Sequence, residues 1–352
     1  MSRKNGPDDV NRRDLMKGAA GVSMAGLLPS WAMAQGARLG AATYGVASID
    51  PSYAMAYVAL KKGYFRDAGL DVAYLNAQSG PRGKQMLAAG QLDMVTTGVN
   101  DSIALSIAGK PSVLVASFDT RVAFANILVN KKLWDSGVRS VKDLKGRSIG
   151  VTQPQSATWL MATYIIDKAG LKGQVNIKPL GDFATMMGAV KSGAVDCTTA
   201  TFGMLEKGQE EGWGVPLFDI TNDANWSSLF GGDVNGYGCY VLQETIDRRP
   251  QVVQALVTGI VKATNFISTA SAQEIADTVF ADYLQGYSMP SVLSAIAVYK
   301  KTWSRDNRIT KSDFERLIGI MEDRQFSAAE LSKVPYEKSV NMSFVDAARK
   351  AT

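Results

Sequence analysis

Hydrophobic and polar positions alternate along the chain in a way that predicts strands and helices in turn. The predicted elements are a strand at 37–45, a helix at 51–69, a strand at 70–77, a helix at 84–90 and a strand at 91–98. The long helix has apolar side chains at helical spacing and opens at Asp50 and Pro51. This order of elements is typical of a parallel sheet with crossover helices.

The same order returns about a hundred residues later. The second set is a strand at 146–153, a helix at 156–170, a strand at 174–180, a helix at 183–193 and a strand at 194–202. Matching positions are Ala68-Gly69-Leu70 with Ala169-Gly170-Leu171, Gly90 with Gly193, Asp93 with Asp196, and Thr96 with Thr199. The repeat predicts two similar lobes, although chance convergence on one local geometry is the alternative.

Two extended segments, near 124–129 and 236–243, are predicted to cross between the lobes. The expected fold class is α/β, a two-lobed binding-protein fold with two hinge crossings and a cleft at the carboxyl ends of the strands. The expected division is 36–123 with 237–352 in the first lobe and 124–236 in the second. Beyond residue 244 the pattern is mainly helical, at 248–268, 272–284 and 289–303, and these helices are expected to brace the first lobe.

Residues 1–34 have the order of an export signal. Arg12 and Arg13 are adjacent, a short apolar run follows Lys17, and Ala32 and Ala34 flank Met33 as a small-x-small cleavage site. The pattern predicts a twin-arginine signal peptide and a periplasmic location, against the alternative of a tail with a chance arginine pair. No later segment is continuously apolar for twenty residues, so no membrane insertion is expected after cleavage.

Charge and composition exclude several function classes. Loss of residues 1–34 lowers the formal charge from +5 to +3, because five basic and three acidic side chains leave with them. Basic residues are scattered, which gives no sign of nucleic-acid binding. The chain has no histidine, which excludes Ser-His-Asp and Cys-His catalysis and His-containing zinc sites. Cys197 and Cys239 are expected to be buried small residues, with a disulfide as the alternative.

Residues 52–72 and 88–98, followed by 141–151, resemble the periplasmic binding proteins of nitrate, sulfonate and bicarbonate importers. That family also includes taurine-binding proteins and proteins that bind pyrimidine precursors of thiamine. The resemblance implies a type II binding protein, without metal, cofactor or catalysis. It would act as a monomer that closes on a small ligand and delivers it to ABC permease and ATPase subunits.

The resemblance also implies which loops hold ligand. In the first lobe they contain Ser48, Ser52, Tyr53, Ser79, Gly80, Arg82, Gly98, Val99 and Asn100. In the second lobe they contain Gln153, Gln155, Ser156, Ala157, Thr158, Asp182, Phe183, Thr201 and Phe202, and Tyr237 lies beside the returning hinge strand.

The chemistry of these loops favours an organic anion, either a sulfonate or a carboxylate. An aromatic ligand of this class would also use the cleft tyrosines, whose rings suit stacking on a planar ring. Ser156 and Thr158 open a helix, where free amides and hydroxyls can surround an anion, or where they act only as helix caps. Arg82 would match such a ligand bidentately, unless it is an ordinary exposed arginine. A neutral pyrimidine is the alternative ligand. A pyrimidine-synthase-like enzyme and a sensor component are the alternative functions.

Overall fold

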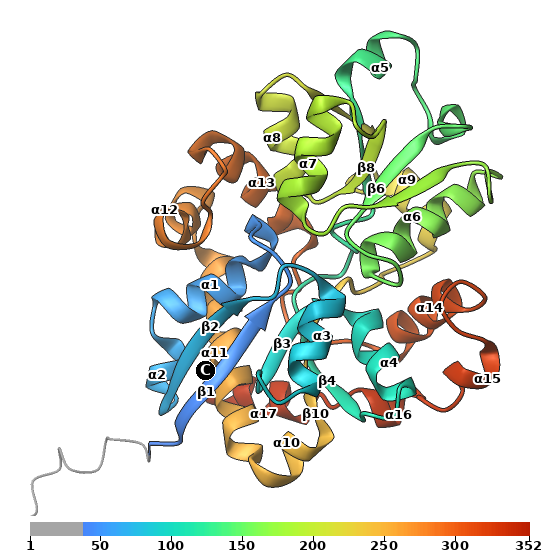
Figure 1. Cartoon of the computed structure of the whole chain (residues 1–352). Helices are drawn as coiled ribbons and strands as arrows, with labels where there is room; N and C mark the ends of the chain where they lie inside the picture. The colour runs from blue at the N-terminus through green and yellow to red at the C-terminus, as the bar shows by residue number, and fades with distance from the viewer. Residues whose placement is uncertain (1–37) are drawn as a thin grey trace, which may run out of the picture. The chain divides into compact units, whose positions relative to one another are not determined.

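The computed structural model describes residues 38–352, so the predicted signal peptide lies outside the described residues. One group of strands is β1 (Gly40–Val46), β2 (Leu70–Asn76), β3 (Met94–Gly98), β4 (Ser112–Ser117) and β10 (Tyr237–Leu242). A second group is β5 (Asn126–Asn130), β6 (Ser148–Val151), β7 (Asn176–Pro179), β8 (Cys197–Ala200) and β9 (Gly214–Phe218). They form two five-stranded sheets, ordered β2-β1-β3-β10-β4 and β7-β6-β8-β5-β9 (Figure 1).

In each sheet the fourth strand, β10 or β5, belongs to one of the two segments that cross between the lobes. β1 runs parallel to β2 and β3, and β6 runs parallel to β7 and β8, as the repeat predicts. β10 and β5 are antiparallel to their neighbours. The physical reason is that each crossing strand starts at the cleft edge, where the parallel strands end: Asn126 pairs with Ala200, the last residue of β8. The predicted two-lobed α/β fold is confirmed, with mixed sheets.

Both helices predicted for this part of the first lobe differ from the observed ones, and the structure adds one that was not predicted, α4 (Val99–Ile107). The observed helices are η2 (Pro51–Tyr53, a 3-10 helix), α1 (Ala54–Lys61), α2 (Tyr64–Asp67), α3 (Gly80–Ala88) and α4. The single helix predicted at 51–69 is broken because Gly63 has a φ of 74°, which an α-helix does not allow. Helix α3 starts four residues before the predicted position 84, because Ser79 caps it by accepting a hydrogen bond from the Arg82 amide.

The second lobe repeats the anchoring contacts of the first. Its helices are α5 (Lys131–Asp135), η3 (Val141–Leu144), α6 (Ala157–Lys168), α7 (Phe183–Ser192), α8 (Phe202–Glu210) and α9 (Asp223–Phe230). Asp93 Oδ2 accepts a hydrogen bond from the Thr43 amide at 2.8 Å, and Asp196 Oδ2 accepts one from the Ser148 amide at 2.7 Å. The two aspartates that the repeat matched therefore tie the third strand of each lobe to the first.

Eight helices follow the second crossing. They are α10 (Gln243–Arg248), α11 (Pro250–Thr269), α12 (Ala272–Tyr283), α13 (Met289–Thr302), α14 (Lys311–Met321), α15 (Ala328–Leu331), α16 (Tyr336–Ser339) and α17 (Ser343–Ala351). Within 38–352, α11 is the one helix long and apolar enough to cross a membrane, yet 61% of its apolar stretch is buried in the protein. It packs on α1, α2 and α17. Helix α11 is therefore buried in the way that a core helix of a folded domain is.

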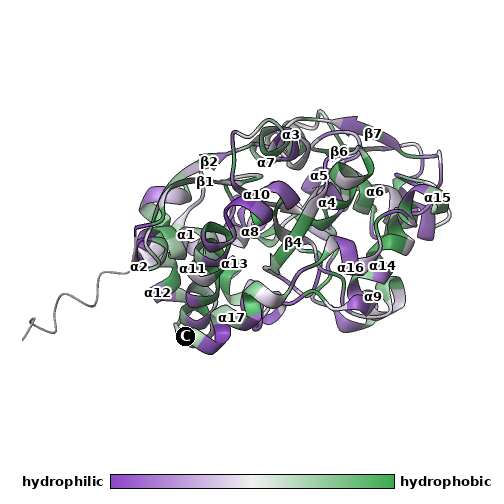
Figure 2. Cartoon of the chain, turned by 90° about the horizontal axis from the view of Figure 1, so that it is seen from below, coloured by the Kyte–Doolittle hydropathy of each residue, from purple (hydrophilic) through white to green (hydrophobic). Residues whose placement is uncertain are grey.

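Most of these helices pack on the first lobe, as expected, but not all of their contacts are there. α13 also packs on α8, and α14 also contacts α6, so the carboxyl-terminal helices reach the second lobe as well. Figure 2 shows β4 hydrophobic along most of its length, in keeping with its complete burial. The boundary residues of the lobes, 36–123 with 237–352 and 124–236, stay a prediction.

Candidate ligand-binding cleft

A small cavity lies where the carboxyl ends of strands from both sheets face one another. Its volume is about 20 Å³. It is lined by Ala47, Ser48, Tyr53, Ser79, Gly80, Gly98, Asp101, Phe124 and Tyr237 from the first lobe and the crossings, and by Thr152, Ser156, Ala157, Thr158 and Phe183 from the second lobe. A space of this size holds about one water molecule, so a larger ligand requires the lobes to separate.

The amino termini of four helices meet at this cavity. Gly80, Ala157 and Phe183 are the first residues of α3, α6 and α7, and Gly98 is the residue that precedes α4. Amides in the first turn of a helix have no acceptor within the helix, and the helix dipole adds positive potential there. Four such ends form an environment that favours negative charge without a cationic side chain.

Three hydroxyl groups of the second lobe form a connected group at the cavity wall. Thr158 Oγ1 lies 2.8 Å from Thr152 Oγ1 and 2.9 Å from Ser156 Oγ, and it accepts a hydrogen bond from the Thr152 amide at 3.0 Å. Ser156 Oγ also accepts one from the Trp159 amide at 3.1 Å, so it caps α6. Capping and cavity lining, which the sequence presented as alternatives for Ser156, occur together.

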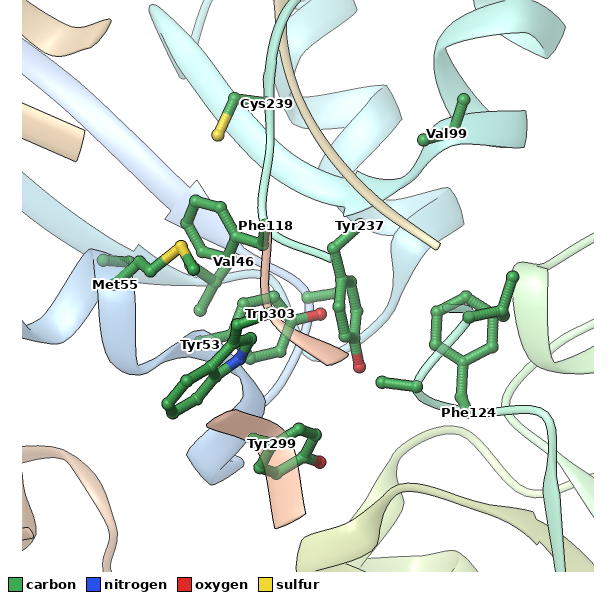
Figure 3. Close-up of a cluster of buried hydrophobic side chains, with 14 of the residues drawn as sticks. Val46, Tyr53, Met55, Val99, Phe118, Phe124, Tyr237, Cys239, Tyr299 and Trp303 are labelled. Atoms are coloured by element: carbon green, nitrogen blue, oxygen red, sulfur yellow. The ribbon is translucent and has the colours of Figure 1, made fainter. Parts of the chain in front are cut away.

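An aromatic wall comes from the first lobe and the two crossings. The Tyr237 ring lies 4.7 Å from the Tyr53 ring and 5.1 Å from the Phe124 ring, centroid to centroid (Figure 3). Burial raises the pKa of both tyrosine hydroxyls well above its ordinary value, so both are protonated donors. Tyr53 Oη is buried and has no hydrogen-bond partner among the described residues, which leaves one donor available at the cavity.

The cavity also contains one buried carboxyl group, which the sequence reasoning missed. Asp101 is fully buried, and its Oδ2 accepts a hydrogen bond from Thr97 Oγ1 at 2.9 Å. Its Oδ1 lies 3.9 Å from Lys84 Nζ and accepts no hydrogen bond from the described residues. Burial raises the pKa of Asp101, while Lys84 and the Thr97 hydrogen bond oppose that rise.

A second buried carboxylate joins the lobes beside the cavity. Asp50 accepts hydrogen bonds from Tyr299 Oη at 2.8 Å and Tyr287 Oη at 3.0 Å, and from Thr201 Oγ1 of the second lobe at 2.6 Å. Tyr299 Oη in turn accepts one from the Phe202 amide at 3.1 Å. Thr201 and Phe202 therefore belong to this interlobe cluster instead of the cavity wall.

The backbone carbonyl of Gln155 makes another contact between the lobes. The carbonyl oxygen accepts hydrogen bonds from Gln325 Nε2 at 2.7 Å and from Asn100 Nδ2 at 3.5 Å. Gln155 has a φ of 63°, a conformation that is uncommon for a residue other than glycine. The contact holds the turn that leads into Ser156, and thereby holds the amino terminus of α6 at the cavity.

The crossings meet at a buried carboxyl group. Asp119 Oδ1 accepts hydrogen bonds from the Gly236 amide at 2.7 Å and the Tyr237 amide at 3.1 Å, which ties the first crossing to the second. Asp119 Oδ2 has no hydrogen-bond partner within 38–352. Burial raises the pKa of Asp119 to about 8, despite the opposing effect of the two amides.

The structure brings about half of the predicted site residues together. Those that line the cavity are Ser48, Tyr53, Ser79, Gly80, Gly98, Ser156, Ala157, Thr158, Phe183 and Tyr237. Those outside its wall are Ser52, Arg82, Val99, Asn100, Gln153, Gln155, Asp182, Thr201 and Phe202. The missed residues are Ala47, Asp101, Phe124 and Thr152. The sequence signal that could have identified Asp101 is its position three residues after Gly98, the last residue of the strand predicted at 91–98.

Several of the residues outside the wall support it. Ser52 Oγ donates a hydrogen bond to Tyr237 Oη at 3.3 Å, and Asp182 caps α7 by accepting one from the Thr185 amide at 2.7 Å. The Arg82 guanidinium instead pairs with the side chain of Gln78 on the exposed side of α3. An arginine clamp on the ligand, expected from the sequence, is therefore not part of the observed cavity wall.

Other kinds of site can be assessed within 38–352. No group of three or more acidic, cysteine or histidine side chains in this part of the chain is arranged to hold a metal ion. Cys197 and Cys239 are both free and buried. Burial raises the pKa of the Cys239 thiol to about 12 and that of the Cys197 thiol even more, so neither is a thiolate near neutral pH.

Comparison with known proteins gives a consistent result. A sequence model of the family described as NMT1/THI5 like matches residues 50–272. A Bacillus subtilis (strain 168) protein, provisionally named an aliphatic sulfonates-binding protein, is 34% identical over 112 residues, or 31% of this chain. The chain matches only 33% of the length of that relative.

Solved structures resemble the chain over most of its length. One from Bordetella bronchiseptica RB50 is 26% identical and has a TM-score of 0.79, with 90% of this chain and 99% of that chain covered. The periplasmic nitrate-binding protein NrtA from Synechocystis PCC 6803 has a TM-score of 0.71 over 88% of each chain. At 14% identity, the second likeness concerns the fold alone.

Proposed function

The chain belongs to the NMT1/THI5-like family, and we propose that it is the periplasmic binding component of an ABC importer, which holds a small organic anion between its two lobes. The anion is a sulfonate or a carboxylate. The similar Bacillus subtilis protein is named for sulfonate binding, which supports this class of ligand. Export by the twin-arginine route, and delivery to a permease with its ATPase, are parts of the same proposal.

One observation carries the choice of an anion. The first residues of α3, α6 and α7, and the residue before α4, all line one cavity, and none of the described lining residues is Lys or Arg. Helix amino termini and hydroxyl donors can bind an anion without burying an opposite full charge. The Tyr53 hydroxyl, which has no other partner within 38–352, adds a neutral donor.

Binding would act through closure of the lobes. A ligand that contacts α3 in one lobe and α6 in the other has more contacts in the closed form than in the open one, so it shifts the population towards closure. The Asp50–Thr201 and Gln155–Gln325 hydrogen bonds, which span the lobes, stabilise the closed form observed here, and a ligand larger than one water molecule would hold the lobes further apart than this. A permease would then recognise the closed form.

A ligand panel tests this proposal on the full chain. Ethanesulfonate, benzoate and nitrate would be compared with a neutral aminopyrimidine by thermal shift and calorimetry. An organic anion is expected to raise the melting temperature progressively, with the logarithm of its concentration once that exceeds the Kd, because it binds only the folded state. Binding of the pyrimidine alone, or turnover of any of these compounds, would contradict the proposal.

A matched pair of threonine variants locates the site. Thr158→Val removes a hydroxyl from the cavity wall and should weaken anion binding by about 1 to 2 kcal/mol. Thr163→Val removes a hydroxyl from the same helix, where it donates to the Leu160 carbonyl at 2.9 Å and does not line the cavity. Equal affinities in the two variants would exclude the Thr158 side of the cavity as the binding site.

A neutral aminopyrimidine is the second candidate ligand, and a specific observation favours it. Asp101 offers an acceptor for an amino group, and the rings of Tyr237 and Phe124 offer a surface for a planar ring. The helix termini argue against it, because they gain nothing from a neutral ligand. The ligand panel distinguishes the two.

A further inference from the structure

The loop between α14 and α15, here called the carboxyl-terminal turn (residues 322–327), contacts both lobes. It follows the second crossing in the chain, and α15 beyond it packs on α4 of the first lobe. Helix α14, which leads into the turn, packs on α6 of the second lobe and lies next to α6 in Figure 1. The turn therefore joins the two helices α4 and α6, whose amino termini both meet at the cavity.

The backbone of the carboxyl-terminal turn is closely hydrogen-bonded. The Gln325 amide donates to the Met321 carbonyl at 2.9 Å. The Asp323 amide donates to the Phe326 carbonyl at 3.0 Å. Ser327 then caps α15 by accepting a hydrogen bond from an amide in the first turn of that helix. Side chains of the turn are therefore presented to the second lobe from a fixed backbone.

The turn holds the carboxyl end of α6 through an ion pair. Arg324 Nε lies 3.3 Å from Asp167 Oδ2, and the two side chains are only 19% and 16% exposed. The attraction is electrostatic, because Nε makes no aligned hydrogen bond within the described residues. The Arg324 guanidinium also lies over the Tyr164 ring, 5.0 Å from its centroid. Removal of either partner would leave a partly buried charge without compensation, which is costly.

Asp167 occupies a position at which a helix by itself disfavours a carboxylate. It is the residue before the last one of α6, and the carboxyl end of a helix carries negative potential. A cation from outside the helix offsets this repulsion, and the Arg324 side chain supplies one. The ion pair is therefore a specific part of the fit between the turn and α6.

The same turn also holds the amino end of α6. Gln325 Nε2 donates to the Gln155 carbonyl, two residues before the first residue of the helix. Gln325 Oε1 accepts a hydrogen bond from Asn100 Nδ2 of α4 at 3.5 Å. Two consecutive residues of the turn therefore fix both ends of one helix. Because Asp167 lies about 15 Å along the helix from the cavity-lining Ala157, a ligand can widen the cavity while the ion pair stays intact.

We infer that the carboxyl-terminal turn is a third connection between the lobes, and that Arg324 is a positioning residue that acts through Asp167. It keeps α6 aligned so that the amino terminus of this helix faces the cavity, although Arg324 itself does not line the cavity. The consequence for ligand affinity rests on the proposed function, whereas the connection between the lobes can be tested without any ligand. Loss of the pair should let α6 tilt, which removes preorganised amides from the ligand site.

The first experiment uses the full-length chain without ligand. Arg324→Gln and Asp167→Asn should each increase the radius of gyration in small-angle scattering, because one of the connections between the lobes is lost. Each should also speed hydrogen exchange of the Trp159 amide, in the first turn of α6, about tenfold. The double variant that exchanges the charges, Arg324→Asp with Asp167→Arg, should restore both measurements, which a role in packing alone would not predict.

Arg308→Gln is the matched control for this experiment. Arg308 pairs with Asp346 of α17, a contact that does not involve the second lobe. Its loss should leave the scattering and the exchange of the Trp159 amide unchanged. Calorimetry with ethanesulfonate should then show an affinity reduced about tenfold in Arg324→Gln and unchanged in Arg308→Gln.

The outcomes separate the connection between the lobes from the proposed function. If Arg324→Gln and Asp167→Asn scatter and exchange like the unaltered chain, the third connection is excluded, whichever compounds bind. If the charge exchange does not restore the measurements, the ion pair is excluded as the basis of the connection. If the single variants open and the double variant recovers, but no anion of the ligand panel binds, the proposed function fails while the connection stands.

Discussion

The two repeats are alike at one end of their strands and different at the other. Away from the cleft, Asp93 and Asp196 make the same hydrogen bonds to the first strand of each lobe, at 2.8 and 2.7 Å. At the cleft, the first lobe has Asp101 in the first turn of α4. The second lobe instead has Thr201 before α8, and Thr201 donates a hydrogen bond to Asp50 of the first lobe.

This difference shows which contacts define the fold and which define the site. The anchoring aspartates satisfy buried strand amides, a requirement that is the same in both lobes. The cleft residues face a ligand or the opposite lobe, and those surroundings differ between the copies. The lobes therefore share their architecture, while the first lobe supplies the charge and the aromatic wall and the second supplies hydroxyl groups.

The largest expected effect lies in the crossings, outside both repeats. Since burial raises the pKa of Asp119 to about 8 in the folded chain, against an ordinary value of about 3.8, the folded state holds a proton that the unfolded state loses first. The free energy of unfolding should therefore fall as pH rises from about 4 to about 8. Asp119→Asn should flatten this slope in urea titrations across that range.

Other groups make part of the slope. Burial also raises the pKa of Asp101, Glu206 and Asp233, so the variant should reduce the pH dependence without abolishing it. A slope that is the same in Asp119→Asn and the unaltered chain would contradict the assignment.

The next effect tests the likeness of the two anchors. Asp93→Ala and Asp196→Ala should each lower the free energy of unfolding by about 2 kcal/mol, because each leaves a strand amide without its charged acceptor. Urea unfolding would measure both, with exposed Asp135→Ala as a control. Clearly unequal losses would show that the two anchors are not equivalent.

A smaller effect concerns closure, to which each lobe contributes one glycine. A Cβ at Gly98 would lie 2.7 Å from Ala157 Cβ in the other lobe, and one at Gly203 would lie 2.6 Å from Asp50 Oδ2. Alanine at either position should hinder closure and weaken ligand binding about tenfold, or about 1.4 kcal/mol. Binding calorimetry and small-angle scattering would show weaker affinity and a more open chain.

The control for closure is Gly188→Ala in α7, where an added Cβ meets no atom within 4 Å. That variant should bind ligand normally and gain stability, because alanine favours a helix over glycine. Normal affinity in both Gly98→Ala and Gly203→Ala would show that the lobes approach less closely when ligand is bound.

The smallest effect compares the two helix caps. Ser156 Oγ accepts from the Trp159 amide at 3.1 Å, while Ser79 Oγ accepts from the Arg82 amide at 3.4 Å. Ser156→Ala should therefore cost about 1 kcal/mol of stability, and Ser79→Ala should cost less. Thermal unfolding of both variants tests the order, and the reverse order would show that the longer hydrogen bond is the stronger cap.

The sequence predicted much of the fold and part of the site. Hydrophobic periodicity placed the strands and helices of both repeats, because spacing along one segment reports which face is buried. It did not place β4 or β9, and it located the two crossing strands without predicting that they pair antiparallel, since no local pattern states which sheet a strand joins or in which direction. It predicted one helix at 51–69, where the backbone breaks at Gly63.

For the site, the loops were predictable and the individual side chains were not. Ser156 and Thr158 could be chosen because they open a helix in sequence. Arg82 was chosen because it follows Gly80-Pro81 in a predicted turn and its guanidinium matches an anion. The guanidinium instead turns away to Gln78, a choice between side-chain rotamers that no local pattern encodes. Thr201 was assigned to the ligand from its place in a predicted ligand loop, because its partner Asp50 is distant along the chain and no local spacing reveals that contact.

The amino-acid sequence alone determined the repeat, the order of strands and helices within it and the lack of histidine chemistry, because these depend on residue identity and local spacing. Only the tertiary structure decided that Asp101 faces the cavity and that Asp50 joins the lobes. Contacts between residues far apart in sequence depend on how the two sheets face each other. That arrangement follows from the packing of the whole chain and from no single segment of it.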